Sequence, residues 1–203
     1  MNPGIRVLRR VGSWVAAAVA LLLIINLGNR ILEFQRDTRY FQRPFEVSVA
    51  MGETKLTRTF GVAVVSVRGA GAITDPTGGV PHGTNGIWII VTLRATALDG
   101  PREIGHYSLR DARDRVFWAS DRVKQGIHGG RTLQPGVWIE GEVAFEVPRD
   151  VATGKLTVLL AEHRFDTRVD SMIAVELDGV TTSAVDTWAS DRTATLAATT
   201  VIE

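Results

Sequence analysis

Residues 137–147 read VWIEGEVAFEV and carry the clearest secondary-structure signal in the chain. Apolar residues occupy every second position, which is the period of a β-strand. The strand therefore has two different faces. Its apolar face holds Val137, Ile139, Val143, Phe145 and Val147, and its other face holds Trp138, Glu140, Glu142, Ala144 and Glu146. A strand with one apolar face needs a second layer to bury that face.

Similar patterns recur along the chain on both sides of this stretch. Further strands are predicted at residues 60–67, 87–98, 107–110, 116–119, 156–161 and 173–177. The stretches 60–67 and 156–161 are apolar on both faces, as in central strands of a sandwich. The two short runs around Asp111 and Asp114 predict a hairpin.

Stretches rich in glycine and proline separate these strands and are predicted to be loops. They cover residues 71–86, 99–102, 126–136 and 148–154. No helix is expected after residue 45. About seven strands without helices predict an all-β fold, an antiparallel two-sheet β-sandwich. The Thr/Ala-rich tail 179–203 is expected to be partly disordered, with Trp188 able to hold part of it on the domain.

An uncharged apolar run, Val11–Leu27, comes after Arg6, Arg9 and Arg10 near the N-terminus. We interpret residues 11–28 as a transmembrane signal anchor. Two alternatives are a cleaved signal peptide, although small residues are missing after the run, and a buried soluble helix. With no cysteine in the chain, a lipoprotein anchor is excluded.

Charge counting hardly distinguishes the two possible orientations of the anchor, because four further arginines lie beyond the apolar run. We favour a cytoplasmic N-terminus and an extracytoplasmic C-terminal domain at the cell membrane, since the first hydrophobic segment usually directs export of the residues after it. The predicted organisation is a cytoplasmic tail (1–10), the anchor in the lipid bilayer (11–28), a juxtamembrane amphipathic linker (29–57), the sandwich (58–178) and the tail (179–203).

The linker carries apolar residues at helical spacing, among them Phe34 and Phe41. Either this aromatic stripe rests on lipid headgroups as part of a stalk, or it docks another membrane protein.

Net charge excludes one class of partner. The chain has 23 basic and 22 acidic residues, and the three arginines before the anchor leave 20 basic and 22 acidic residues for 29–203. Nucleic-acid binding requires a basic excess, so we expect no nucleic-acid partner. The absence of cysteine also excludes disulfides and thiolate metal sites.

Several of these elements together resemble a known domain. The matching pieces are residues 88–93, 109–111, 115–117, 133–136 and 141–148, within 58–178. They resemble a bacterial immunoglobulin-like domain of unknown function, found in small secreted or membrane-anchored Gram-positive and actinobacterial proteins and related in fold to a mycobacterial secreted immunoprotective antigen. The resemblance implies export, an immunoglobulin-like β-sandwich and no established catalytic residues. This chain departs from it in lacking a lipoprotein cysteine and in having Asp114 and Arg115 where the hairpin often carries glycine.

No catalytic, cofactor or metal motif emerges from the remaining polar residues. The four histidines are scattered. His82 and His128 lie in glycine-rich loops that could meet at one end of the sandwich, but we expect them to be solvated loop residues. The glycines of 71–86 lack the lysine and helix of a phosphate-binding loop. Glu140, Glu142 and Glu146 share a strand face, which exposed acids explain better than a hydrolase pair. We therefore expect no cofactor and no catalysis.

The sequence accordingly favours a non-catalytic interaction module, an accessory protein of a cell-envelope or transport complex. Its candidate contact residues are Trp88, Trp118 and Trp138 on the domain and Phe34 and Phe41 on the linker, since aromatic residues supply much interface energy. The alternative is an extracytoplasmic lipid- or glycan-binding domain that uses the loops near His82 and His128. A deep apolar pocket between the sheets favours the second hypothesis, and a flat apolar patch favours the first.

Overall fold

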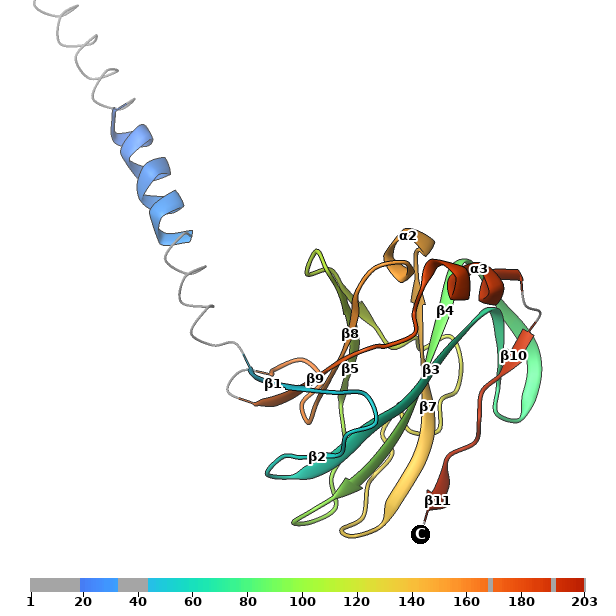
Figure 1. Cartoon of the computed structure of the whole chain (residues 1–203). Helices are drawn as coiled ribbons and strands as arrows, with labels where there is room; N and C mark the ends of the chain where they lie inside the picture. Colours follow the sequence, from blue (N-terminus) through green and yellow to red (C-terminus); the bar gives the residue numbers. More distant parts are fainter. Residues whose placement is uncertain (1–18, 33–43, 168–169, 191–192, 203) are drawn as a thin grey trace, which may run out of the picture. The chain divides into compact units, whose positions relative to one another are not determined.

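The computed structural model describes residues 19–32, 44–167, 170–190 and 193–202. The chain divides into two units, Met1–Arg43 and Pro44–Glu203. The first unit contains a helix over residues 19–32 (Figure 1). Among the residues in these ranges, no helix combines the length and the apolar character needed to cross a membrane. The expected anchor at 11–28 and the linker residues Phe34 and Phe41 lie partly or wholly outside the described residues.

The described residues of the second unit form two β-sheets and two short helices (Figure 1). One sheet has five strands in the order β1 (Phe45–Val49), β9 (Ser171–Glu176), β8 (Leu156–Ala161), β5 (His106–Asp111) and β6 (Val116–Trp118). The other has six, namely β10 (Thr193–Thr195), β3 (Phe60–Asp75), β4 (Gly78–Ala97), β7 (Trp138–Val147) and β11 (Thr200–Ile202) in that order, with β2 (Lys55–Leu56) paired to β3. The helices are α2 (Arg149–Ala152) and α3 (Thr182–Ser190).

The core lies between the two sheets, as the alternation of residues 137–147 predicts. Ile139, Val143, Phe145 and Val147 are buried on the inner face of β7. Side chains from both sheets meet them, including Phe60, Ile89, Leu93, Tyr107, Leu109, Val158, Leu160 and Ile173. The predicted two-sheet β-sandwich is therefore confirmed.

The predicted hairpin around Asp111 is also confirmed as the β5–β6 connection. The Asp111 carboxylate accepts hydrogen bonds from the backbone N–H groups of Arg113 (2.9 Å) and Arg115 (2.8 Å) and from the Arg115 guanidinium (2.7 Å). Asp114 takes a left-handed conformation with φ 58°. These bonds stabilise the turn without the glycine that often occupies such a position.

The prediction of a purely antiparallel sandwich is wrong at two sheet edges. β1 pairs with β9 in parallel, and β10 pairs with β3 in parallel. In each pair the two strands are far apart in the sequence, so the direction in which they meet depends on the path of the whole chain. Local alternation carries no information about that path.

The glycine-rich stretch 71–86 forms a hairpin extension and not the predicted loop. β3 continues to Asp75 and β4 begins at Gly78, whose backbone has φ 81°. Glycine adopts this conformation at little cost, so the turn can close tightly. The glycines of this stretch thus lie at the turn and within the two strands that it joins.

The sandwich extends beyond the predicted range 58–178 in both directions. β1 and β2 lie within the residues expected to be linker, and α3, β10 and β11 lie within the expected tail. The prediction of no helix after residue 45 is therefore also wrong. Short edge strands and a nine-residue helix carry weak local signals, and they form here because they pack against the sheets.

The C-terminal segment, residues 193–202, covers the outer face of the six-stranded sheet. It pairs with β3 at one edge through β10 and with β7 at the other edge through β11. Between these edges Leu196 is buried in an apolar cluster whose other members are Ala70, Ile73, Trp88, Ile90, Val123 and Ala144. The sheet face that the sequence predicts to be solvent-exposed is therefore largely buried at this end of the sheet.

Helix α3 approaches the same sheet through Trp188, and Gly69 makes the approach possible. A Cβ atom added to Gly69 would lie 2.4 Å from Cε3 of Trp188 and 2.9 Å from the Trp88 carbonyl oxygen. By contrast, a Cβ at Gly83, on β4, meets nothing within 4 Å.

We predict that Gly69→Ala lowers the free energy of unfolding by roughly 1–3 kcal/mol because the methyl group overpacks this contact. Gly83→Ala is the matched control and should change stability by less than about 0.5 kcal/mol. Urea denaturation of both variants measures the difference. The double variant Gly69→Ala/Trp188→Ala should lose less unfolding free energy than the sum of the losses in the two single variants. Full additivity of these losses would contradict the proposed contact.

Candidate functional site

The three tryptophans expected to form one binding face are distributed over three environments. Trp88 is fully buried, its Nε1–H donates to the His82 carbonyl oxygen (2.9 Å), and the Arg122 guanidinium lies 5.5 Å from its ring centroid. It is a core residue, so its assignment as a contact residue is wrong. The C-terminal segment and Val123 cover the strand face on which it lies.

Trp118 and Trp138 lie on the outward faces of different sheets. The side chain of Trp138 points outward from β7, because successive residues of a strand point to opposite faces and its neighbour Ile139 is in the core. Trp118 pairs with Ser108, which faces outward from β5 because Tyr107 and Leu109 are in the core. No single flat partner surface can contact both residues, so they define two separate surfaces.

The first surface, here the Trp138 patch, consists of Leu56, Trp138 and Ile202. Leu56 pairs with Gly61 of β3, and Ile202 pairs with Trp138. A Cβ at Gly61 would meet Leu56 Cδ2 at 2.7 Å and Trp138 Cη2 at 3.2 Å, so these two side chains lie side by side over the glycine. Leu56 is 56% exposed, and Trp138 is half-buried.

Charged residues border the Trp138 patch on the same face. Arg94 Nε donates to Glu140 Oε2 at 2.8 Å. Glu140 is the next residue after Trp138 on the outward face of β7, and Arg94 is its partner on β4. An apolar centre with a polar border is the usual composition of a protein-binding surface.

The second surface, here the aromatic edge, consists of Trp118 on the edge strand β6 and Phe165 in the β8–β9 loop. The rings of Trp118 and Phe165 lie 6.2 Å apart between centroids. The backbone N–H of Phe45 donates to the Asp170 carbonyl oxygen at 2.8 Å, where the same loop enters β9. Phe45 does not belong to the aromatic edge, because β1 and β6 are the opposite edge strands of the sheet. Phe165 is 83% exposed, Phe45 64% and Trp118 44%.

His106 packs against Trp118, one of the residues of the aromatic edge. Its ring lies 4.6 Å from the Trp118 ring between centroids. Nδ1 is 3.2 Å from the Arg164 carbonyl oxygen, which only an N–H can satisfy, and Nε2 is 2.8 Å from the Ser108 hydroxyl. Burial lowers the pKa of His106, and the hydrogen bond to Arg164 and the charge of Asp170 oppose the shift without cancelling it.

The acidic residues of β7 are each paired with an arginine. Glu140 binds Arg94, Glu142 binds Arg68 and Glu146 binds Arg122. Burial raises the pKa of Glu146, but hydrogen bonds from Thr84 and Arg122 outweigh it, and the net effect is a lowered pKa. Glu142 is buried, contrary to its expected position on an exposed face. These carboxylates are therefore engaged in ion pairs within the sheet.

His82 and His128 have different surroundings in the structure. His128 packs edge-on against Tyr107, with ring centroids 5.4 Å apart, whereas His82 lies in the β3–β4 hairpin. Across the described part of the chain, no three His, Cys, Asp or Glu side chains are grouped so that they could hold a metal ion.

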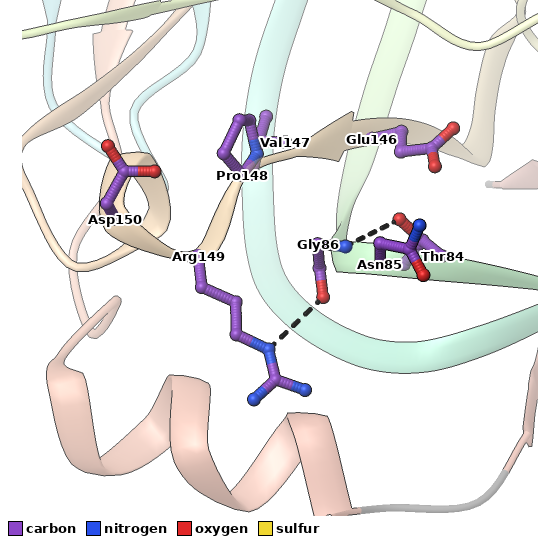
Figure 2. A pocket seen from close by; sticks show the side chains of 8 residues that line it. All are labelled: Thr84, Asn85, Gly86, Glu146, Val147, Pro148, Arg149 and Asp150. Carbon is purple, nitrogen blue, oxygen red and sulfur yellow. Dashed lines mark hydrogen bonds between the residues drawn. The ribbon is translucent and has the colours of Figure 1, made fainter.

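A hollow of about 440 Å³ lies where the start of β4 meets the end of β7 and α2 (Figure 2). Within it Gly86 N–H donates to Thr84 Oγ1 (2.9 Å), and Arg149 Nε donates to the Gly86 carbonyl oxygen (3.4 Å). Figure 2 shows the carboxylates of Glu146 and Asp150 at opposite ends of the hollow. The two acids do not converge on a common point, so the hollow lacks the geometry of a carboxylate pair.

A groove of about 600 Å³ lies on the outer face of the five-stranded sheet, lined in part by Arg110, Lys155 and Glu176. Arg110 on β5 binds Glu46 on β1 at 2.6 and 2.8 Å and so spans β8 and β9. Lys155 pairs with Glu176 at 2.5 Å. These pairs make the groove strongly polar.

Sequence reasoning missed Leu56, Ile202 and Phe165 as surface residues of interest. Phe165 had a usable signal, since it is a single aromatic residue within the polar run HRFDTR between two strands. Leu56 and Ile202 become significant only through strand pairing.

No family model and no curated protein sequence matches this chain. Solved structures similar to it include the yjhA protein from Bacillus subtilis, with 15% identity, a TM-score of 0.44 and coverage of 62% of this chain and 98% of that one. Another is an uncharacterised beta-sandwich protein from Clostridium difficile 630, with 8% identity, a TM-score of 0.45 and coverage of 67% and 97%. At these values the similarities carry no argument about function.

We predict that mild acid destabilises the sandwich through His106. Its pKa is lower in the folded state than the unfolded value of about 6.5, so the unfolded chain gains the proton first and stability falls as the pH drops below that value. The free energy of unfolding, measured by urea denaturation at about pH 7.5 and pH 5.5, should fall less in His106→Gln than in the unaltered chain. His82→Gln serves as the control. Equal pH dependence in all three proteins would contradict the prediction.

Proposed function

We propose that this chain is a single-pass membrane protein whose immunoglobulin-like sandwich lies on the extracytoplasmic side and binds a protein of a cell-envelope or transport complex without catalysis. Several separate observations support this proposal. They concern the N-terminal segment, the Trp138 patch and the filled interior of the sandwich.

The N-terminal segment supports membrane anchoring. The uncharged run Val11–Leu27 comes after three arginines in the sequence. In the described helix over residues 19–32, the apolar side chains Leu21, Leu22, Leu23, Ile24 and Ile25 are exposed. Consecutive exposed apolar residues cover all sides of a helix, which suits a lipid environment better than one face of a soluble domain.

The Trp138 patch is the observation that carries the binding proposal. The C-terminal segment covers much of the same sheet face, whereas Leu56, Trp138 and Ile202 remain accessible beside the Arg94–Glu140 pair. Gly61 leaves room for the Trp138 ring to pack close to the β3 backbone and beside Leu56, which limits its conformational freedom before binding. A preorganised aromatic side chain loses little entropy when a partner covers it.

The interior of the sandwich gives the alternative less support. Large side chains such as Phe60, Tyr107 and Phe145 fill the space between the sheets. The hollow beside α2 and the groove on the five-stranded sheet lie outside this space and have charged linings. A lipid ligand requires an apolar cavity, so lipid binding inside the sandwich is disfavoured. Glycan binding at the polar groove is the alternative that a crosslinking experiment distinguishes.

Site-specific photo-crosslinking in intact cells tests the proposal. A photoreactive residue at Leu56 should yield an adduct with an identifiable envelope protein. The same residue at Val80, exposed in the β3–β4 hairpin, is the matched control and should not yield it. Trp138→Thr, which keeps a strand-compatible side chain, should reduce the Leu56 adduct about tenfold or more, as expected for an interface anchor.

Circular dichroism and the melting temperature must show that the Trp138→Thr variant is folded. An adduct that persists in this variant, or that forms equally from Val80, contradicts the proposed surface. Recovery of glycan only, from a photoreactive residue placed at Lys155 in the groove, supports the alternative.

A further inference from the structure

Strand β1 is the longest edge strand in the described sandwich. It has five residues, Phe45–Val49, whereas the edge strands β2, β6, β10 and β11 have two or three. Within the strand pairings of the described residues, β1 pairs only with β9, and Figure 1 shows these two strands side by side. The other side of β1 is therefore a free edge, where a further strand can be added to the sheet.

The hydrogen bonding of β1 shows which backbone groups lie on the free edge. The Phe45 N–H donates to the Asp170 carbonyl oxygen at 2.8 Å, so the backbone groups of Phe45 point toward β9. Backbone groups alternate sides along a strand, so those of Val47 also point toward β9. The N–H and C=O of Ser48, an exposed residue, therefore point to the free edge.

The free edge of β1 lacks the usual protection of an edge strand. Such strands are commonly protected by a bulge, a proline or a charged side chain. β1 pairs with β9 in an unbroken register from Phe45 to Val49. Its one charged residue, Glu46, is bound by the Arg110 guanidinium at 2.6 and 2.8 Å, so its charge is compensated. Phe45 is also 64% exposed, which leaves an aromatic ring uncovered at the start of the strand.

We propose that the free edge of β1 pairs in antiparallel direction with β1 of a second copy of this chain, with Val47 at the two-fold axis. The five-stranded sheets of the two copies then join into one continuous sheet. This inference does not depend on the proposed function, and it leaves the Trp138 patch, on the other sheet, available for a different partner.

The backbone directions select this register. With Val47 opposite Val47 of the second copy, the Ser48 N–H donates to the Glu46 carbonyl oxygen of that copy, and the two-fold axis repeats the bond. A register centred on Glu46 would place the two Glu46 side chains opposite each other, and like charges in that position are unfavourable.

The side chains of β1 are complementary to themselves in this register. Phe45, Val47 and Val49 share the face toward the core, where Val49 is buried and Val47 packs against its cluster. Phe45 lies opposite Val49 of the second copy, so the exposed ring gains an apolar neighbour. On the other face Glu46 lies opposite Ser48. The strand can therefore pair with its own copy without a charge clash.

Disulfide formation between copies tests the register. The chain has no cysteine, so a single introduced cysteine reports one position. In the proposed pair, the residues at position 47 are opposite each other with Cα atoms about 4.5 Å apart, a distance that suits a disulfide. The purified full-length chain carrying Val47→Cys, in detergent, should form a covalent dimer under mild oxidation several times faster than Val80→Cys. Val80, exposed in the β3–β4 hairpin, is the matched control.

A second substitution removes the proposed hydrogen bond. Ser48→Pro deletes the N–H that points to the free edge and leaves the pairing with β9 intact, as proline at an edge strand allows. Added to Val47→Cys, it should slow disulfide formation several-fold, whereas Ser48→Ala, which keeps the N–H, should not. Circular dichroism must show that each variant is folded.

Sedimentation equilibrium, in a detergent matched to the density of the solvent, measures association without a cysteine. The unaltered chain should sediment as a dimer, and Ser48→Pro should shift it toward the monomer. Equal disulfide rates at positions 47 and 80, a rate that Ser48→Pro leaves unchanged, or a monomeric unaltered chain each overturns the inference. None of these results bears on the Leu56 adduct, so the proposed function is tested separately.

Discussion

The buried carboxylate of Glu142 organises the outer face of the six-stranded sheet. It accepts hydrogen bonds from Arg68 Nε (3.0 Å), Arg68 Nη2 (2.8 Å) and the backbone N–H of Ala197 (2.6 Å). Arg68 Nη2 also donates to the Thr195 carbonyl oxygen. A carboxylate buried without such partners costs several kcal/mol. The C-terminal segment adds one hydrogen bond to each member of this ion pair, which joins β3, β7 and residues 193–202 into one structure.

This arrangement determines which apolar surface remains accessible. The segment buries Leu196 against Trp88, Ile90 and their neighbours, and its two short strands occupy both edges of the sheet. Occupied edges and a covered apolar face protect a β-domain from uncontrolled association. On the outer faces, exposed aromatic surface is then concentrated at the Trp138 patch and the aromatic edge.

Much of the sandwich was predictable because each central strand carries its own alternation. Residues 137–147 and 156–161 form β7 and β8 nearly as predicted, and the Asp111 hairpin results from local turn chemistry. The candidate surfaces were harder to predict. Trp118 is exposed and Trp138 is half-buried, whereas Trp88 on a similar outward position is fully buried. Nothing near Trp88 in the sequence indicates that residues 193–202, about a hundred positions later, cover it.

By itself, the sequence determined the features that depend on neighbouring residues: the two-faced strands, the turns, the apolar N-terminal run and the absence of disulfides. Side-chain period and turn preference are local properties, so they can be read without the fold. Only the tertiary structure decided the parallel edge pairs, the burial of Trp88 and Glu142, and the meeting of Phe45 with the Phe165 loop. Each of these depends on contacts between distant segments, whose free energy arises from burial and pairing after the chain has folded.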